Sequence, residues 1–147
     1  MKLPSFNKNG ILPRGVYECQ FSEAKNLLVR NEKRKSLWDK FEQFLNWIRP
    51  MNFFEYVYID GSYITDKEEP NDIDIVLEIN NSFSSEISSV DRKVFDHNYV
   101  LNNFSLDAYI SPSKNNFSEF FQYVGVKEGL SRGLNPKDKK GILKVKI

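Results

Sequence analysis

The segment Tyr58-Ile59-Asp60-Gly61-Ser62 is followed, about ten residues after the serine, by Asn71-Asp72-Ile73-Asp74-Ile75-Val76-Leu77. The apolar residues before Gly61 predict one strand over 54–60, and those around Asp74 predict a second over 72–79. Asp72 and Asp74 are two positions apart, so a strand presents both carboxylates on one face. Two unpaired acids repel each other and lose hydration there, so we expect a cation beside them.

A third acid, Asp107, lies within the apolar run Phe104-Ser105-Leu106-Asp107-Ala108-Tyr109-Ile110, which predicts a strand over about 103–110. If this strand lies beside the second, Asp107 joins Asp72 and Asp74 in one acidic cluster. Oxygen ligands of this kind suit Mg²⁺ or Mn²⁺, and two such ions would support phosphoryl chemistry. Asp107 is also the candidate base for an attacking hydroxyl. Its structural alternative is to cap a backbone amide or pair with a lysine.

The Gly61-Ser62 pair follows the first predicted strand directly. Glycine permits a sharp turn and a close backbone approach to a ligand, and the amides and the Ser62 hydroxyl can donate to phosphate oxygens. Tyr63 either stacks on a nucleotide base or packs inside the domain. Gly61, Ser62 and Tyr63 are therefore the candidate nucleotide-binding residues.

The chain has 147 residues, 40% hydrophobic and 28% charged, with a formal net charge of +1, which is typical of one globular domain without a strong overall field. The single Cys19 suits a reducing cytoplasm, and no apolar run predicts a signal peptide or a membrane span. We expect an N-terminal arm, residues 1–21, packed on a single minimal domain, residues 22–147, with a basic C-terminal extension.

Helical patterns complete the predicted domain. One helix begins near Ser22 and breaks around Asn31. A second helix ends at Pro50, and its predicted apolar stripe is Leu37, Phe41, Phe44, Leu45 and Ile48. The basic residues of the second helix form either a solvated face or, as the alternative, a nucleic-acid contact. They are Lys33, Arg34, Lys35 and Lys40. A weak helical pattern occupies part of 80–103, a helix over 117–124 is capped by Gly125, and the alternation over 142–147 predicts an edge strand or a docked extension.

His97 and the basic C-terminal tail each allow a structural and a functional interpretation. His97, the only histidine, is expected to be solvated or locally bonded rather than a catalytic base. The basic tail is expected to be solvated, or else to clamp a triphosphate or an RNA acceptor. Its cations are Lys127, Arg132, Lys137, Lys139 and Lys140.

The order strand, Gly-Ser, spacer, Asp-x-Asp strand and later acidic strand resembles the nucleotidyltransferase superfamily that includes DNA polymerase beta. The matching residues are Gly61, Ser62, Asp72, Asp74 and Asp107, within about 54–111. More narrowly, the chain resembles small bacterial and phage-associated nucleotidyltransferase-like proteins, whose N-terminal arm carries a Leu-Pro-x-Gly motif, here Leu12-Pro13-Arg14-Gly15. The resemblance implies an α+β fold, a mixed β-sheet with helices packed mainly on one face.

The resemblance further implies a Mg²⁺-dependent enzyme that moves a nucleoside monophosphate from an NTP to a hydroxyl on RNA, protein or a small molecule, releasing pyrophosphate. Such proteins can act within toxin–antitoxin or defence systems. The chain departs from the pattern in its acidic loop, Asp66, Glu68 and Glu69, which follows Ser62, and it has little room for an acceptor domain. The alternative is therefore a non-catalytic, antitoxin-type regulatory module that binds a neighbouring-gene protein, and a weaker reading is an RNA-binding domain.

Overall fold

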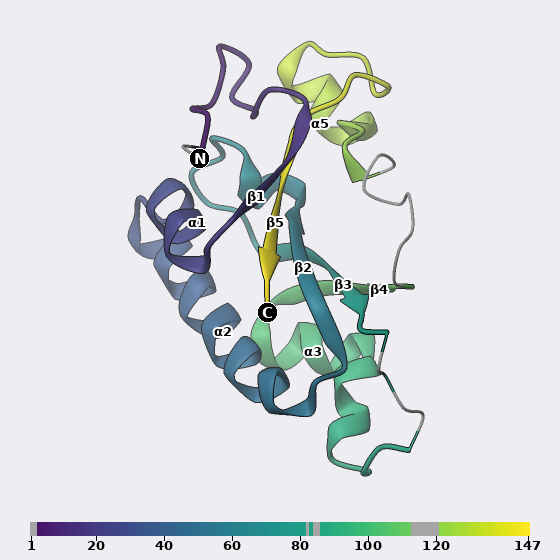
Figure 1. Cartoon of the computed structure of the whole chain (residues 1–147). Helices are drawn as coiled ribbons and strands as arrows, with labels where there is room; N and C mark the ends of the chain where they lie inside the picture. Colours follow the sequence, from purple (N-terminus) through teal and green to yellow (C-terminus); the bar gives the residue numbers. More distant parts are fainter. Residues whose placement is uncertain (1–2, 82, 84–85, 113–120) are drawn as a thin grey trace.

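The computed structural model describes residues 3–81, 83, 86–112 and 121–147 as an α+β unit built on one mixed five-stranded sheet (Figure 1). The strands are β1 (Gly15–Cys19), β2 (Phe54–Asp60), β3 (Ile73–Ile79), β4 (Leu106–Ser111) and β5 (Gly141–Lys146). Their order is β1-β5-β2-β3-β4. β2 is antiparallel to both neighbours, whereas the outer pairs β1–β5 and β3–β4 are parallel. The mixed sheet expected from the sequence is thus confirmed.

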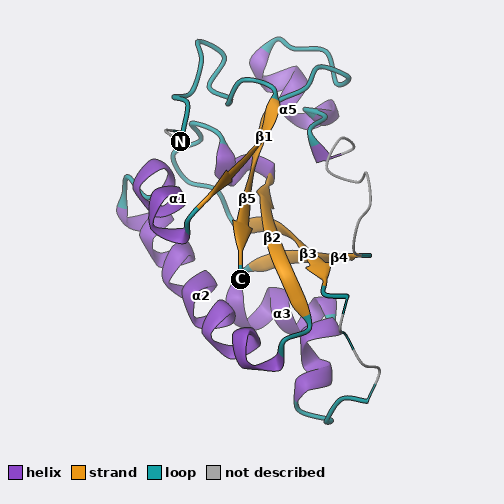
Figure 2. Cartoon of the chain, in the orientation of Figure 1, coloured by secondary structure: helices purple, strands orange, loops and turns teal. Residues whose placement is uncertain are grey.

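Helices α1, α2 and α3 lie along one side of this sheet, and α5 lies near the end where β5 begins (Figures 1 and 2). The helices are α1 (Phe21–Leu28), α2 (Glu32–Ile48), α3 (His97–Phe104) and α5 (Gly125–Arg132). Short 3₁₀ turns cover Arg49–Met51, Gly61–Ile64 and Asp91–Phe95. No helix in the described ranges combines the length and the apolar character needed to cross a membrane.

Local sequence explains where α2 begins and ends. Asn31 is its N-cap, and the side-chain oxygen accepts a hydrogen bond from the Arg34 amide at 2.8 Å. The helix passes at Ile48 into the 3₁₀ turn that contains Pro50. Its apolar stripe is fully or almost fully buried: Leu37, Trp38, Phe41, Phe44, Leu45 and Ile48. The helical period in the sequence therefore identified the core-facing side of α2.

The sheet presents one apolar and one largely polar face. Val57 and Ile59 of β2 are paired in register with Leu77 and Ile75 of β3, and all four are completely buried. The alternate positions carry a different chemistry, and in β3 they are Asp74, Val76 and Glu78. Period-two alternation thus sets the core on one face and leaves the acidic residues on the other.

The two chain termini contribute more to the sheet than expected. The predicted irregular arm contains β1, and the C-terminal alternation forms β5, an interior strand between β1 and β2 rather than an edge. The lysines that suggested an edge project from the polar face instead. Lys144 Nζ lies 4.1 Å from the ring centroid of Tyr56 in the neighbouring strand β2 and makes a cation–π contact with it.

The structure differs from the sequence predictions in two helical regions, around Gly125 and within 80–103. Gly125, expected as a helix C-cap, has φ +84° and begins α5. Most of the predicted helix over 117–124 lies outside the described residues. In the weak region 80–103, the structure has the 3₁₀ turn Asp91–Phe95 and then α3, whose C-cap Ser105 is left-handed. The predicted strand over 103–110 accordingly begins later, at Leu106.

Arg34 is completely buried, so the predicted solvated basic face of α2 is wrong at this position. Lys33, Lys35 and Lys40 are exposed, as expected. The Arg34 guanidinium donates to four backbone carbonyls, those of Leu28, Tyr63, Thr65 and Lys67, at 2.6 to 3.1 Å. Burial lowers its pKa to about 10. Helical periodicity missed this role because the partners lie at the end of α1 and in the segment 63–67, which reaches α2 only in the folded chain.

Candidate functional site

Three carboxylates lie side by side across three neighbouring strands. Asp60 at the end of β2 is the register partner of Asp74 in β3, and Asp74 is the register partner of Asp107 in β4. Residues paired across a sheet project from the same face, so these three side chains share the polar face. Asp72 stands two residues before Asp74, just ahead of β3. The fold therefore brings the three predicted acids together and adds a fourth, Asp60, which the sequence reasoning did not nominate.

Gly61 lies directly against this row. Its φ of +71° is a left-handed conformation that favours glycine, and a Cβ there would overlap the Asp74 carboxylate. Gly61 opens the 3₁₀ turn Gly61–Ile64, which ends where the Ser62 carbonyl accepts hydrogen bonds from the amide and hydroxyl of Thr65. The sharp turn that the Gly-Ser motif predicted after β2 is therefore present, and it places the Gly61 backbone against Asp74.

The acidic row strongly affects Asp74. Burial, followed by the charges of Asp72, Asp107 and Asp60, raises the pKa of Asp74 from 3.8 to about 7, while Lys140 opposes the shift. Burial and then Asp107 also raise the pKa of Asp72, against Lys127 and Lys67. The cluster thus retains protons that isolated carboxylates would lose, because negative charge accumulates in a partly desolvated place.

Asp107 is held from two sides. The Tyr109 hydroxyl donates to Asp107 Oδ2 at 3.4 Å, and His97 Nε2 lies 3.2 Å from Oδ1. Oδ1 is buried and has no partner with hydrogen-bond geometry in the described part of the chain. The other ring nitrogen of His97, Nδ1, lies 3.2 Å from the Ala108 carbonyl oxygen. His97 is therefore a neighbour of the site, a placement that its polar sequence surroundings did not indicate.

Lys140 supplies a positive charge to the other end of the row. Its Nζ donates to Asp60 Oδ1 at 2.7 Å, and the lysine is only 3% exposed. The predicted solvation of the basic tail is thus wrong at Lys140, whose ammonium group contacts a carboxylate instead of solvent. The sequence contains no signal of this burial, because β5 was expected at an edge and its interior place comes from pairing with β1 and β2.

The acidic loop after Ser62 is tied to other parts of the fold. Asp66 forms a 2.7 Å ion pair with Arg132 of α5, and the Asn31 side chain donates to the Glu68 carbonyl at 2.7 Å. Arg34 holds the Thr65 and Lys67 carbonyls. The acids of this loop are not among the charges that shift the pKa of Asp72 or Asp74. The loop is therefore held by contacts with Asn31 and Arg34 of the α2 region and with Arg132 of α5.

Tyr63 belongs to the core rather than to the site. Its side chain is completely buried, its hydroxyl donates to the Arg34 carbonyl at 2.8 Å, and its ring stacks with Trp38 at 6.1 Å between centroids. The guanidinium carbon of Arg34 lies 4.7 Å from the centroid of the same ring. A ring enclosed in this way cannot stack on a nucleotide base, so Tyr63 is left out of the candidate nucleotide-binding residues.

The chemistry of the site fits a hard divalent cation. Its donors are carboxylate oxygens, Asp107 Oδ1 is buried without a hydrogen bond, and negative charge raises the pKa of Asp74. Asp72, Asp74 and Asp107 are the residues that would hold it. Among the described residues no three acidic, histidine or cysteine side chains already converge as a closed metal shell. Asp60 is paired with Lys140, and Asp107 contacts both His97 and Tyr109.

Comparison with known proteins assigns the family. Residues 4–146 match the model of DUF6932, described as a family of unknown function. The chain belongs to DUF6932. Neither the curated proteins nor the solved structures include a match to it. The whole site of this DUF6932 protein, from Asp60 to Lys140, lies inside the matched region.

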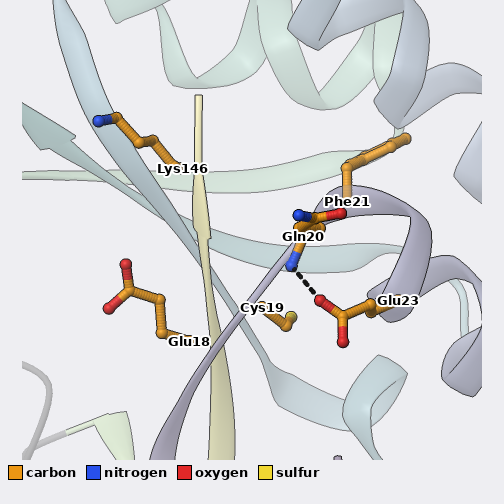
Figure 3. A pocket seen from close by; sticks show the side chains of 6 residues that line it. All are labelled: Glu18, Cys19, Gln20, Phe21, Glu23 and Lys146. Carbon is orange, nitrogen blue, oxygen red and sulfur yellow. Dashed lines mark hydrogen bonds between the residues drawn. The ribbon is translucent and has the colours of Figure 1, made fainter. Parts of the chain in front are cut away.

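A separate pocket of about 370 Å³ lies at the junction of β1 and α1 (Figure 3). Its lining includes Glu18, Cys19, Glu23 and Lys146, and the Gln20 amide donates to Glu23 Oε1 at 3.0 Å. Burial, then Glu23 and Glu18, raises the pKa of Cys19 to about 11, so the sulfur stays a thiol at neutral pH. This pocket therefore lacks an activated nucleophile, and the chemistry of the DUF6932 chain is better sought at the carboxylate row.

The raised pKa of Asp74 predicts how stability depends on pH. Folding favours the protonated form of Asp74, so its contribution to stability is fully present below the pKa that Asp74 has in the unfolded chain. This contribution is lost as the pH rises from about 4 to the folded-state pKa of about 7. The rise in the pKa of Asp74 to about 7 corresponds to a loss of as much as about 4 kcal/mol of stability over this pH range. Urea unfolding in EDTA should therefore give a lower free energy at about pH 8 than at about pH 5.

Two aspartate variants, one inside the row and one outside it, show whether this pH dependence comes from Asp74. Asp74→Asn should reduce the pH-dependent fall and be more stable than the wild type at about pH 8, whereas Asp91→Asn, outside the row, should keep the wild-type profile. Identical slopes in wild type and Asp74→Asn would show that Asp74 ionises freely in the folded protein.

Proposed function

We propose that this DUF6932 protein is a minimal, single-domain nucleotidyltransferase with the fold of the DNA polymerase beta superfamily. The reaction would move a nucleoside monophosphate from an NTP to a hydroxyl, with Mg²⁺ or Mn²⁺ as cofactor. The observation that carries the proposal is the approach of Gly61 to Asp74, in a row where Asp74 and Asp107 are register partners. A half-buried acidic row beside a glycine turn favours a ligand that combines divalent cations with phosphates.

Each residue has a role that its position supports. Asp72, Asp74 and Asp107 would hold the cation, which when bound neutralises charge on the phosphates and the attacking oxygen. The backbone around Gly61 and Ser62 would bind the β and γ phosphates. Asp107 would accept the proton of the attacking hydroxyl. These tasks are positioning and charge neutralisation, which dominate catalysis of this reaction class.

The surroundings of Asp72 favour a bound polyphosphate. Lys67 and Lys127 oppose the rise in the pKa of Asp72. Both line a pocket of about 360 Å³ together with Ser131 and the ion pair of Glu128 with Arg132. Positive charge on one side of an acidic row is suited to a substrate whose phosphates are anionic. The proposed enzyme acts in the cytoplasm, and its acceptor class is a hydroxyl of RNA, protein or a small molecule.

A second candidate function is a non-catalytic module on the same fold, acting as an antitoxin-type regulatory partner of a neighbouring-gene protein. The observation that favours it is Lys140, whose Nζ is 2.7 Å from Asp60 at the end of the acidic row. A buried lysine can partly neutralise carboxylates without a metal. The two candidates differ in whether the chain transfers a nucleoside monophosphate from the bound NTP to a hydroxyl.

Calorimetry of the full chain tests the proposal. Each of the four ribonucleoside triphosphates is titrated in Mg²⁺ into the wild type and into the double variant Asp72→Ala with Asp74→Ala. We expect the wild type to bind at least one Mg-NTP and the variant to lose at least about 100-fold in affinity, because the cation ligands are gone. Circular dichroism checks that the variant remains folded.

A control removes the same number of charges elsewhere. Glu68→Ala with Glu69→Ala, on the exposed loop, should keep the wild-type affinity within about threefold. Equal affinity in the wild type and the Asp72/Asp74 variant would overturn the site assignment. Transfer of α-phosphate label to RNA or protein that disappears in Asp107→Ala supports the enzyme, whereas Mg-NTP binding without any transfer supports the regulatory module.

A further inference from the structure

The feature that carries a further inference is the hydroxyl of Tyr109. Tyr109 follows Asp107 by two residues on β4, so both side chains project from the polar face. The hydroxyl donates to Asp107 Oδ2 at 3.4 Å. The residue is 51% exposed, and its ring lies 5.7 Å from that of His97. A hydroxyl therefore already stands at the carboxylate to which the proposed function gives the role of base.

Three other tyrosine hydroxyls in the described part of the chain donate to groups outside the carboxylate row. Tyr17 donates to the Pro13 carbonyl, Tyr58 to Glu78, and Tyr63 to the Arg34 carbonyl. Tyr58 and Tyr63 are also buried. Tyr109 thus combines exposure, a hydroxyl and direct contact with the proposed base, which are the properties of an acceptor.

We propose that Tyr109 is itself an acceptor and that the protein transfers a nucleoside monophosphate from a ribonucleoside triphosphate to the Tyr109 hydroxyl in cis. This inference rests on the proposed function and names an acceptor for that same site. Transfer to Tyr109 requires no acceptor domain.

The step balances as a simple group transfer. The phenolic oxygen of Tyr109 forms a bond to the α phosphorus of the triphosphate, and Asp107 Oδ2 takes the phenolic proton. The bond from the α phosphorus to the oxygen bridging to the β phosphate breaks, and pyrophosphate leaves. The product is a tyrosyl nucleotide phosphodiester beside Asp107. Because the product fills the acceptor position, each chain would accept at most one nucleotide there.

The test incubates the purified full chain with Mg²⁺ and each ribonucleoside triphosphate, labelled either on the α or on the γ phosphate. We expect α label and no γ label, up to one nucleotide per chain. Trypsin would release the peptide 94–114, in which fragmentation should assign the nucleotide to Tyr109 rather than Tyr99. Transfer of the γ label, or attachment at another residue, would overturn the proposal.

Matched variants separate the acceptor from the rest of the site. Tyr109→Phe and Asp107→Asn should each lose at least about 90% of the label, since they lack the acceptor and the base. Tyr123→Phe changes another exposed tyrosine, 43% exposed, and should be labelled like the wild type. A wild-type level of label in Tyr109→Phe would refute the assignment.

A mixing experiment tests the cis geometry. Asp74→Asn retains Tyr109 but loses a proposed cation ligand, whereas Tyr109→Phe retains the three proposed cation ligands. When the two variants are mixed, we expect no label on Tyr109 of the Asp74→Asn chain, and label there would contradict transfer in cis. Calorimetry of the wild type separates the two levels of failure. Mg-NTP binding without label at Tyr109 rejects this inference alone, while absence of Mg-NTP binding rejects the proposed function with it.

Discussion

Replacing Arg34 by methionine is expected to lower the free energy of unfolding by at least about 4 kcal/mol, because buried carbonyls lose their donor and each unsatisfied group costs about 1–3 kcal/mol. The lost hydrogen bonds are those to Leu28, Tyr63, Thr65 and Lys67. In a chain of this length such a loss lowers the melting temperature by roughly 10 °C. Thermal and urea unfolding measure it directly.

The control for Arg34 is its neighbour Arg30. Arg30 donates to the same Thr65 carbonyl at 3.1 Å, but it is exposed, so Arg30→Met should cost less than about 1 kcal/mol. Arg34→Lys should recover little of the stability, because one ammonium group cannot reproduce a planar fork that reaches four carbonyls. A melting temperature of Arg34→Met within about 2 °C of the wild type would show that water replaces these hydrogen bonds.

The Arg34 variant should also affect the carboxylate row. Its partners Tyr63, Thr65 and Lys67 belong to the segment that connects Gly61 with Asp72. Loosening this connection removes a restraint on the glycine turn that approaches Asp74. We therefore expect a loss of Mg-NTP affinity in Arg34→Met even at temperatures where the variant is fully folded.

The second large effect is expected for Lys140→Met, which should lower the free energy of unfolding by about 3–5 kcal/mol. The substitution leaves Asp60 without its counter-ion in the row with Asp74 and Asp107. Lys140 also opposes the rise in the pKa of Asp74, so its removal should raise that pKa further. Urea unfolding at neutral pH in EDTA measures the loss of stability.

Two variants make the Lys140 prediction specific. Lys137→Met removes an exposed cation from the same tail and should leave stability within about 0.5 kcal/mol of the wild type. Adding Asp60→Asn to Lys140→Met should restore at least about half of the lost stability, because the unpaired charge is then gone. If the double variant is no more stable than Lys140→Met alone, the cost lies in packing around the lysine and not in the charge of Asp60.

Local patterns in the sequence predicted the central strands and the main helix well. The predicted strand over 54–60 coincides with β2, and the strand over 72–79 differs from β3 by one residue at its start. The apolar stripe of α2 and its end near Pro50 were also recognisable. Alternation and helical period are set by the geometry of a single element, so they can be read without knowing its neighbours.

The partners of these elements could not be read in the same way. The pattern over 142–147 indicated a strand, but its place between β1 and β2 depends on pairing with segments more than eighty residues away. Arg34, His97 and Lys140 look alike in sequence, as polar residues in polar surroundings. Their roles differ because Arg34 meets a loop, His97 meets Asp107, and Lys140 meets Asp60.

The sequence by itself determined the chemical types at the candidate site and their spacing along each strand. Asp72 and Asp74 share a face because a strand repeats every two residues, and Gly61 follows β2 directly. Only the tertiary structure decided that Asp107 would be the register partner of Asp74, that Asp60 and Lys140 would extend the row, and that Tyr63 would be enclosed in the core. The physical reason is that spacing along a strand follows from covalent geometry, whereas the neighbours across a sheet depend on the packing of the whole chain.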